Sequence, residues 1–365
     1  MTTPKADPAP PRASGASVLA YWRDVLLIAT LAISGLYAGS GFLIPLVLAI
    51  LTFVLISAIA RRFAGLRILD WRMPNWLAQL LGVVTVVAGL FAITYIMGTQ
   101  ANNFAGAVPR YEAQFDAALG RISYLVGTDI GVFVRDHLVR IDMSLIAMSA
   151  FGGARSVVTY FVLIGIYVGF MMAERHLTAP KIQLVEEEIS SKGGFGRVMH
   201  QIAFSLQRYI LVKTFFSVLT ALFSYAVFLW LGLEFAETWA VLTFALNYIP
   251  SVGSILSVIL PSLVALVQFE TFGPFLTIAL GCGAIQFIIG NLLDPAVTGR
   301  SLNLSALMVI LALTFWSAIW GIMGAFLSVP LTVCLLIVFS HLPATRPLAI
   351  LMSKDGQLFY DEPGT

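Results

Sequence analysis

The sequence contains few charged residues: only 11% of its 365 residues are Asp, Glu, Lys or Arg. Seven runs of 18 to 40 residues contain none of the four, and together they hold 190 residues. A water-soluble domain needs polar and charged residues over its solvent-exposed faces, so this scarcity excludes a soluble globular class. A helix of about 20 apolar residues crosses the hydrocarbon core of a bilayer. The chain is therefore predicted to be an all-α, polytopic helical membrane protein.

The sequence also lacks the residue combinations of several functional classes. Its net charge is only +2, and no basic run is interleaved with aromatic residues, so we expect no nucleic-acid partner. No P-loop, Gly-x-Ser-x-Gly motif or pair of carboxylates within an apolar run occurs, and the four histidines lack metal-ligand spacing. Cys282 and Cys334 lie in apolar runs and are interpreted as buried hydrophobic residues. We therefore expect no enzyme, cofactor or metal site.

The uncharged runs predict the domain organisation. They are Val25–Ala60, Leu77–Met97, Ser156–Ala173, Thr214–Leu233, Thr238–Phe269, Thr271–Leu293 and Ser301–Ser340. Residues 1–20, rich in Pro, Ala and Ser, are expected to form a disordered cytosolic tail. The expected units after it are an N-terminal helical hairpin with a third span (21–97), an extracytoplasmic amphipathic helical segment (98–153), a transport core (154–345) with a cytosolic helical insert (174–208), and a cytosolic tail (346–365).

Several runs are too long for one crossing of the membrane. The first run would extend about 54 Å as a single helix, so we expect a turn at its Gly-Ser-Gly stretch, residues 39–41. The fifth run is interrupted by Asn-Tyr-Ile-Pro-Ser-Val-Gly at residues 247–253. Candidate breaks in the seventh run are Gly321, Gly324 and Pro330. The chain is thus predicted to have about eight spans, with broken or re-entrant helices.

Basic residues in the connections predict the orientation, because cytoplasmic loops are enriched in Lys and Arg. Four arginines between residues 61 and 72, and six basic residues between 175 and 213, indicate that these segments and both termini are cytoplasmic. Residues 98–153 then lie outside. We expect a helix beginning at Pro109 and a second one from Thr128, which cover the membrane, their own protomer or another subunit. On the cytoplasmic side we expect a short helix at Pro180–Ser191 and a longer one from Phe195.

Helix breakers inside apolar runs are the best candidates for a solute site. Backbone groups released by a break are tolerated in a membrane only where protein or a water-filled cavity satisfies them, and transporters build solute sites from such helices. Neutral amides offer donors and an acceptor, which suits an uncharged, polyhydroxylated solute better than a bare cation. The alternatives are close helix packing for the glycines, interfacial anchoring for the charged residues, and hydrogen bonds that tie helices together for the amides. The candidate pathway residues are Asn247, Pro250, Gly253, Pro261, Gln286, Asn291, Asp294, Pro295, Gly299 and Arg300.

Three sequence elements resemble those of a known family. Residues 247–253, followed by Pro261, resemble the Phe-Ile-Pro-x-x-Gly…Pro element of the autoinducer-2 exporter family of bacterial permeases. The residues that match the remaining elements are Gln286, Asn291, Pro295, Gly299, Arg300 and Ser301, then Gly321, Gly324, Pro330 and Leu331, together with Arg208-Tyr209 and Lys213-Thr214. The resemblance covers roughly residues 20–345. The chain departs from the family at Gly290, where a Glu is frequent, and at Ser305-Ala306, where a Pro is common.

The resemblance implies a permease or exporter of a small polar solute such as autoinducer-2, working without ATP hydrolysis. It also implies a homo-oligomer, in contact with membrane lipid, in the bacterial inner membrane. The family's alternative function is sodium or lithium/proton antiport with a coupling ion. Antiport needs a titratable group reachable from both sides, and Gly290 removes one candidate carboxylate. A non-transport membrane scaffold or assembly partner is a third hypothesis, because the amphipathic part of residues 98–153 presents faces that need covering.

Overall fold

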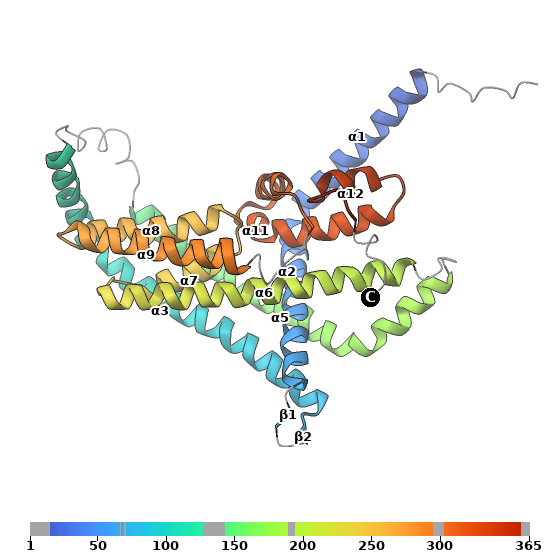
Figure 1. The fold of residues 1–365 in the computed structure, drawn as a ribbon, viewed down its shortest axis with the longest axis horizontal. Helices are drawn as coiled ribbons and strands as arrows, with labels where there is room; N and C mark the ends of the chain where they lie inside the picture. Colours follow the sequence, from blue (N-terminus) through green and yellow to red (C-terminus); the bar gives the residue numbers. More distant parts are fainter. Residues whose placement is uncertain are drawn as a thin grey trace, which may run out of the picture.

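The computed structural model describes residues 15–65, 67–68, 71–126, 143–188, 194–294 and 303–358. Apart from one two-stranded ribbon, the elements in these ranges are helices (Figure 1). In chain order they are α1 (Gly15–Ala38), α2 (Ser40–Ala64), β1 (Arg67–Ile68), β2 (Trp71–Arg72), α3 (Asn75–Val126), α5 (Met143–Glu188), α6 (Gly194–Leu231), α7 (Ala236–Leu246), α8 (Val252–Gln268), α9 (Phe272–Phe287), the π-helix η1 (Ile288–Leu293), α11 (Ala306–His341) and α12 (Arg346–Met352).

The helices confirm the predicted class of polytopic helical membrane protein. In the described part of the chain, six helices are long and apolar enough to cross a membrane, and α7 and α8 are shorter apolar helices. The six candidate spans are Ser40–Ala64, Asn75–Gln100, Tyr160–Thr178, Gly194–Leu231, Phe272–Leu293 and Ala306–His341. The second and third of these bury almost none of their residues within the protein, as expected for apolar helices that face lipid.

The first uncharged run forms two helices, as predicted. α1 ends at Ala38 and α2 begins at Ser40, so the break lies at Gly39, within the expected Gly-Ser-Gly stretch. α2 packs against α3 with close backbone approach. A methyl group at Gly82 of α3 would lie only 2.9 Å from the carbonyl oxygen of Ile56 in α2. Small residues at helix contacts are how membrane helices gain packing energy in the absence of a hydrophobic driving force.

Two helices are longer than the sequence predicted. α3 has 52 residues and continues through position 109, where we expected a new helix to begin; its length is about 78 Å. α5 has 46 residues and continues through Pro180, so the separate helix expected at Pro180–Ser191 is wrong. Proline removes one backbone hydrogen bond, but the strong helix formers that surround it keep the segment helical. The second helix expected from Thr128 lies outside the described residues.

α6 is the axis along which the other core helices are arranged (Figure 1). Its 38 residues correspond to about 57 Å of helix and begin at Gly194, close to the expected start at Phe195. α7, α8 and α9 lie along its C-terminal half, where the core contains Phe228, Ala265, Ile278 and Cys282. α11 lies along its N-terminal half, where the core contains Tyr209, Val329, Val333 and Ile337, with Val198 and Ile202 packed against it.

Candidate functional site

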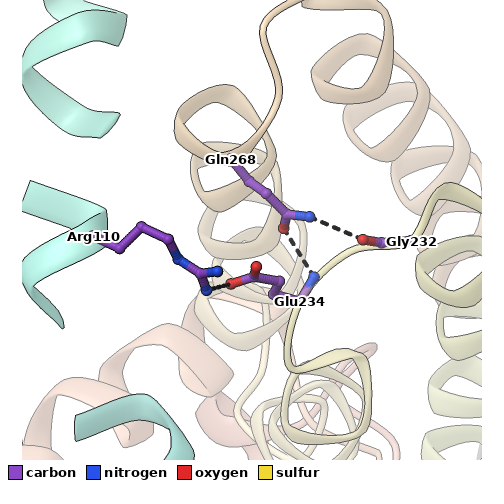
Figure 2. A network of polar contacts seen from close by, with 4 residues as sticks. All are labelled: Arg110, Gly232, Glu234 and Gln268. Atoms are coloured by element: carbon purple, nitrogen blue, oxygen red, sulfur yellow. Dashed lines mark hydrogen bonds and ion pairs between the residues drawn. The ribbon is translucent and has the colours of Figure 1, made fainter. Parts of the chain in front are cut away.

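The interrupted fifth run folds as a helical hairpin made of α7 and α8. α7 ends at Leu246, α8 begins at Val252, and Ser251 between them has a positive φ of 57°. Figure 2 shows how the open end of this hairpin is closed: the Glu234 amide donates to Oε1 of Gln268 at 2.8 Å, and Nε2 of Gln268 donates to the Gly232 carbonyl at 2.9 Å. The start of α7 and the end of α8 therefore lie together, beside the C-terminal end of α6, and the hairpin is re-entrant.

Gly253 makes the tight turn between these two arms sterically feasible. A β-carbon at this position would overlap the carbonyl oxygen of Leu246, so only glycine allows the two backbones to approach this closely. Pro250 is half-buried at the turn, and Pro261 is buried in the middle of α8. Close packing was the alternative interpretation of the glycines, and Gly253 has that role at the tip of the hairpin.

α11, which is long and apolar enough for a span, is instead folded back on itself as a second hairpin. Its helix is broken at Gly321, where φ is 59° and ψ is −138°, while Gly324 and Pro330 lie within the second arm. Nε1 of Trp316 in the first arm donates to Oγ1 of Thr332 in the second at 3.2 Å. A β-carbon at Gly324 would overlap the carbonyl oxygen of Trp316, which repeats the close approach of the first hairpin.

The open end of the second hairpin is also held together by the main chain. The amide of Ser305, just before α11, donates to the carbonyl of Met352 at the end of α12. Leu304 and Ser353 form an isolated antiparallel bridge beside this bond. Both ends of α11 therefore lie on the same side. Because its second arm packs along the N-terminal half of α6, this hairpin approaches the middle of α6 from the end opposite to the first.

The two hairpins meet at their tips. The ring of Tyr248, at the first tip, stacks on Phe326 in α11 with a centroid separation of 4.6 Å and an interplanar angle of 24°. The Tyr248 hydroxyl is hydrogen-bonded to Oγ1 of Thr214, in the middle of α6, at 2.6 Å. Tyr248 is 6% exposed, so this contact is closed off on nearly all sides.

Polar groups from α6 also lie where the two hairpin tips meet. Nδ2 of Asn247, a residue that is 6% exposed, donates to Oγ of Ser217 at 3.0 Å. Nζ of Lys213 lies 3.7 Å from Oδ2 of Asp294, and both side chains are mostly covered. We call Lys213, Thr214, Ser217, Asn247, Tyr248 and Asp294 the hairpin-tip cluster. It joins one turn of α6 to the first hairpin tip and to the end of the π-helix.

Asp294 of this cluster directly follows a π-helix. α9 continues directly into η1, and Asp294 follows its last residue. π-helical turns are uncommon and frequently occur at functional sites, where the extra residue per turn shifts the side chains that follow. Before the π-helix, Gln286 is buried and its Nε2 donates to Oγ of Ser257 in α8 at 2.6 Å. Within it, Asn291 is exposed.

The structure brings some predicted site residues together and not others. Asn247 and Asp294 lie in the hairpin-tip cluster, with Pro250 and Gly253 in the adjoining turn. Gln286 bonds α9 to α8, and Asn291 lies on the surface. The predicted residues Pro295, Gly299 and Arg300 lie outside the described residues.

Sequence reasoning missed the contribution of α6 and of the second hairpin. Ser217 and Phe326 were not proposed as site residues. A signal for the first was present: Lys213, Ser217, Thr220 and Ser224 recur at spacings of four, three and four, which places polar groups on one helix face. Ser217, Thr220 and Ser224 are buried to 1% exposure or less, so this polar face is directed into the protein.

The cluster offers hydroxyl and amide donors and acceptors together with one ion pair. Within the described ranges, no group of three His, Cys, Asp or Glu side chains could hold a metal ion. The hydroxyl and amide groups can form hydrogen bonds with a polar molecule, and the aromatic rings can cover an apolar face.

A sequence model of the AI-2E family transporters matches residues 26–344. The chain belongs to the AI-2E family of transporters. It is 28% identical over 325 residues to the AI-2 transport protein TqsA of Escherichia coli strain K12, covering 87% of this chain and 91% of TqsA. It is 25% identical over 365 residues to YhhT of the same strain, covering 96% and 97%. It is also 25% identical over 323 residues to PerM, covering 84% and 88%. The family predicted from the sequence elements is confirmed.

The elements that identified this AI-2E transporter have clear structural positions. Residues 247–253 form the tip of the first hairpin. Gly321 and Gly324 form the tip of the second. Gln286 lies in α9 just before the π-helix, and Asn291 lies within the π-helix. Several of the residues that carry the resemblance thus lie where helices are broken or widened.

Proposed function

We propose that this AI-2E transporter exports a small, uncharged polar solute past the hairpin-tip cluster, without ATP hydrolysis. The observation that carries the proposal is the meeting of two hairpins, from opposite ends of α6, at a group of polar side chains. Broken helices that meet inside a membrane protein are the arrangement from which secondary transporters build solute sites.

The residues of the cluster support the choice of solute. Asn247, Thr214 and Ser217 supply neutral donors and acceptors, which suit hydroxyl and carbonyl groups. Lys213 and Asp294 neutralise each other, so the site presents no uncompensated charge to attract an ion. TqsA is named as an AI-2 transport protein. An autoinducer-2-like, hydroxyl-rich molecule therefore fits both the chemistry and the relationship.

The other predicted residues complete the proposed pathway. Pro261 and Gln286 shape and join α8 and α9 behind the cluster. Asn291, Pro295, Gly299 and Arg300 stay candidate path residues on the sequence alone: Asn291 is exposed, and the other three lie outside the described residues. The protein resides in the bacterial inner membrane with both termini in the cytoplasm. It assembles as a homo-oligomer, in which neighbouring copies would cover part of the exposed apolar surface of α3 and α5.

Sodium or lithium/proton antiport is the second candidate, and one observation favours it. The Lys213–Asp294 pair is a titratable carboxylate with a cation beside it, at the meeting point of the hairpins. A proton or alkali cation would compete with Lys213 for the carboxylate. In vesicles with an internal pH dye, sodium-driven pH changes that vanish in Asp294→Asn would favour antiport over export of a neutral solute.

Solute flux in proteoliposomes tests the main proposal. Purified protein should move autoinducer-2 across the liposome membrane in the absence of ATP. Tyr248→Leu removes both the stacking on Phe326 and the hydrogen bond to Thr214, worth about 1 kcal/mol each. The combined loss should reduce the flux by up to about thirtyfold. Tyr95→Leu, at an exposed position of α3, is the matched control and should leave the flux unchanged. Folded protein that moves no polar solute would contradict the proposal.

A further inference from the structure

The end of α2 and the ribbon that follows it carry positive charge that the proposed transport path does not use. Arg61 and Arg62 lie in the last turn of α2. In the ribbon, Arg67 pairs directly opposite Arg72. Arg175 of α5 lies within electrostatic range of Arg61. We call these five residues the arginine patch. Figure 1 shows the ribbon projecting from the molecule at the end of α2, away from the hairpins.

Within the patch, the backbone register and the neighbouring helix ends bring positively charged residues together. Like charges directly opposite in a β-ribbon are destabilising, and the register places Arg67 and Arg72 in that arrangement. Arg61 and Arg175 repel each other in the same way. In the part of the chain that the structure describes, Arg61, Arg62 and Arg175 form no ion pair with a carboxylate. Between residues 61 and 72 the sequence has one acidic residue, Asp70. A bound anion would remove this repulsion.

The patch lies where an apolar helix ends. Arg61 and Arg62 lie in the last turn of the candidate span Ser40–Ala64, and Arg175 lies near the end of the candidate span Tyr160–Thr178. The ends of spans are the level at which hydrocarbon gives way to lipid headgroups. Trp76, at the start of α3, is 67% exposed next to the ribbon. Exposed tryptophan at the end of a span is typical of the membrane–water interface. A soluble anion would account for the arginines, but it would not account for the exposed Trp76 or for the position of the arginines at the ends of spans.

We infer that the arginine patch binds the phosphate headgroups of anionic phospholipids. Guanidinium groups bind phosphate oxygens through two parallel hydrogen bonds, which lysine does not provide, and all five cations here are arginines. Basic groups beside the ends of membrane helices bind anionic headgroups in this way. The patch draws its members from α2, the ribbon and α5, so a bound headgroup would also tie α5 to the α2–α3 connection.

Thermal unfolding of the full-length protein in mixed micelles tests this inference. Addition of phosphatidylglycerol should raise the apparent melting temperature by several degrees more than phosphatidylcholine does. Arg61→Gln/Arg62→Gln should lose at least half of that difference. Arg346→Gln/Lys354→Gln removes two exposed cations from the C-terminal region and should keep the full difference. Native mass spectrometry should show the same order in the number of phosphatidylglycerol molecules retained.

A second variant separates lipid binding from a structural role. Arg67→Gln/Arg72→Gln relieves the cross-strand repulsion, so in lipid-free detergent it should melt at the wild-type temperature or above, and yet respond less to phosphatidylglycerol. Three results would overturn the inference: an undiminished response in both arginine variants, an equal loss in the C-terminal control, or the same stabilisation by inorganic phosphate at matched concentration. None of these readouts depends on transport.

Discussion

Replacing Gly253 by alanine tests the geometry of the first hairpin directly. The added methyl group would overlap the carbonyl oxygen of Leu246 and would also lie 3.2 Å from the β-carbon of Ile249. The first obstacle is backbone, so the arms of the hairpin must separate to admit the methyl group. Overpacking of this kind costs about 1–3 kcal/mol, while alanine regains up to about 1 kcal/mol as a better helix former. We expect a net loss of about 2 kcal/mol.

The matched control is Gly283→Ala in α9. No heavy atom lies within 4 Å of the position that its β-carbon would occupy, so the substitution adds helix propensity without a clash. Its stability should stay equal or rise by up to about 1 kcal/mol. Both variants are compared with the wild type by thermal unfolding in one detergent and by solute flux in liposomes. Gly253→Ala should lower the apparent melting temperature by several degrees and should reduce the flux, because it displaces Tyr248 from Phe326.

The result that would refute this reasoning is equal stability and equal flux for Gly253→Ala and Gly283→Ala. It would mean that the two arms do not approach closely at Leu246. A loss of stability with unchanged flux would have a narrower meaning: the turn would be as described, but the position of the tip would not control transport.

Two further predictions concern ion pairs. Lys213→Gln leaves the mostly covered Asp294 without this cation and should reduce both stability and flux. The double variant with Asp294→Asn should recover at least part of the stability. A double-mutant cycle measured by thermal unfolding checks this. Additive losses in that cycle would argue against a coupled pair. Arg110→Gln breaks the 2.6 Å ion pair with Glu234 seen in Figure 2, whose side chains are 56% and 31% exposed. It should cost less than about 1 kcal/mol, and less still at high salt; a larger, salt-independent loss would contradict this assignment.

The breaks in the helices could be predicted from the sequence because their causes are local. Glycine and proline in uncharged runs marked the breaks at residues 39–41 and 247–253, and Gly321 was one of three candidates in the last run. The same reasoning failed at Pro180, since a single proline among good helix formers does not end α5. A lone proline therefore does not predict a break, as Pro45, Pro261 and Pro330 inside their helices also show.

The partners of the tip residues could not be predicted in this way. Phe326 is 78 residues from Tyr248 in the chain, and Ser217 is 30 residues from Asn247. Their contacts depend on two hairpins folding back along one helix, which no local pattern specifies. The π-helix is a second example: nothing in its mainly apolar sequence, Ile-Ile-Gly-Asn-Leu-Leu, predicts a wider turn at residues 288–293.

The energetics of the two hairpins differ between arms and tips, and this difference bears on transport. The arms are held by buried apolar side chains along both halves of α6. The first tip is held to the second and to α6 by an aromatic stack and two hydrogen bonds, from Tyr248 and Asn247, while Ile319 and Trp320 of the second tip pack in an apolar cluster with α2 and α6. The stack and the two hydrogen bonds are worth about 1 kcal/mol each, so under the proposed function a small polar molecule that supplies two or three hydrogen bonds would compete with them. The proposed path therefore predicts that the tips separate around the solute while the arms stay packed.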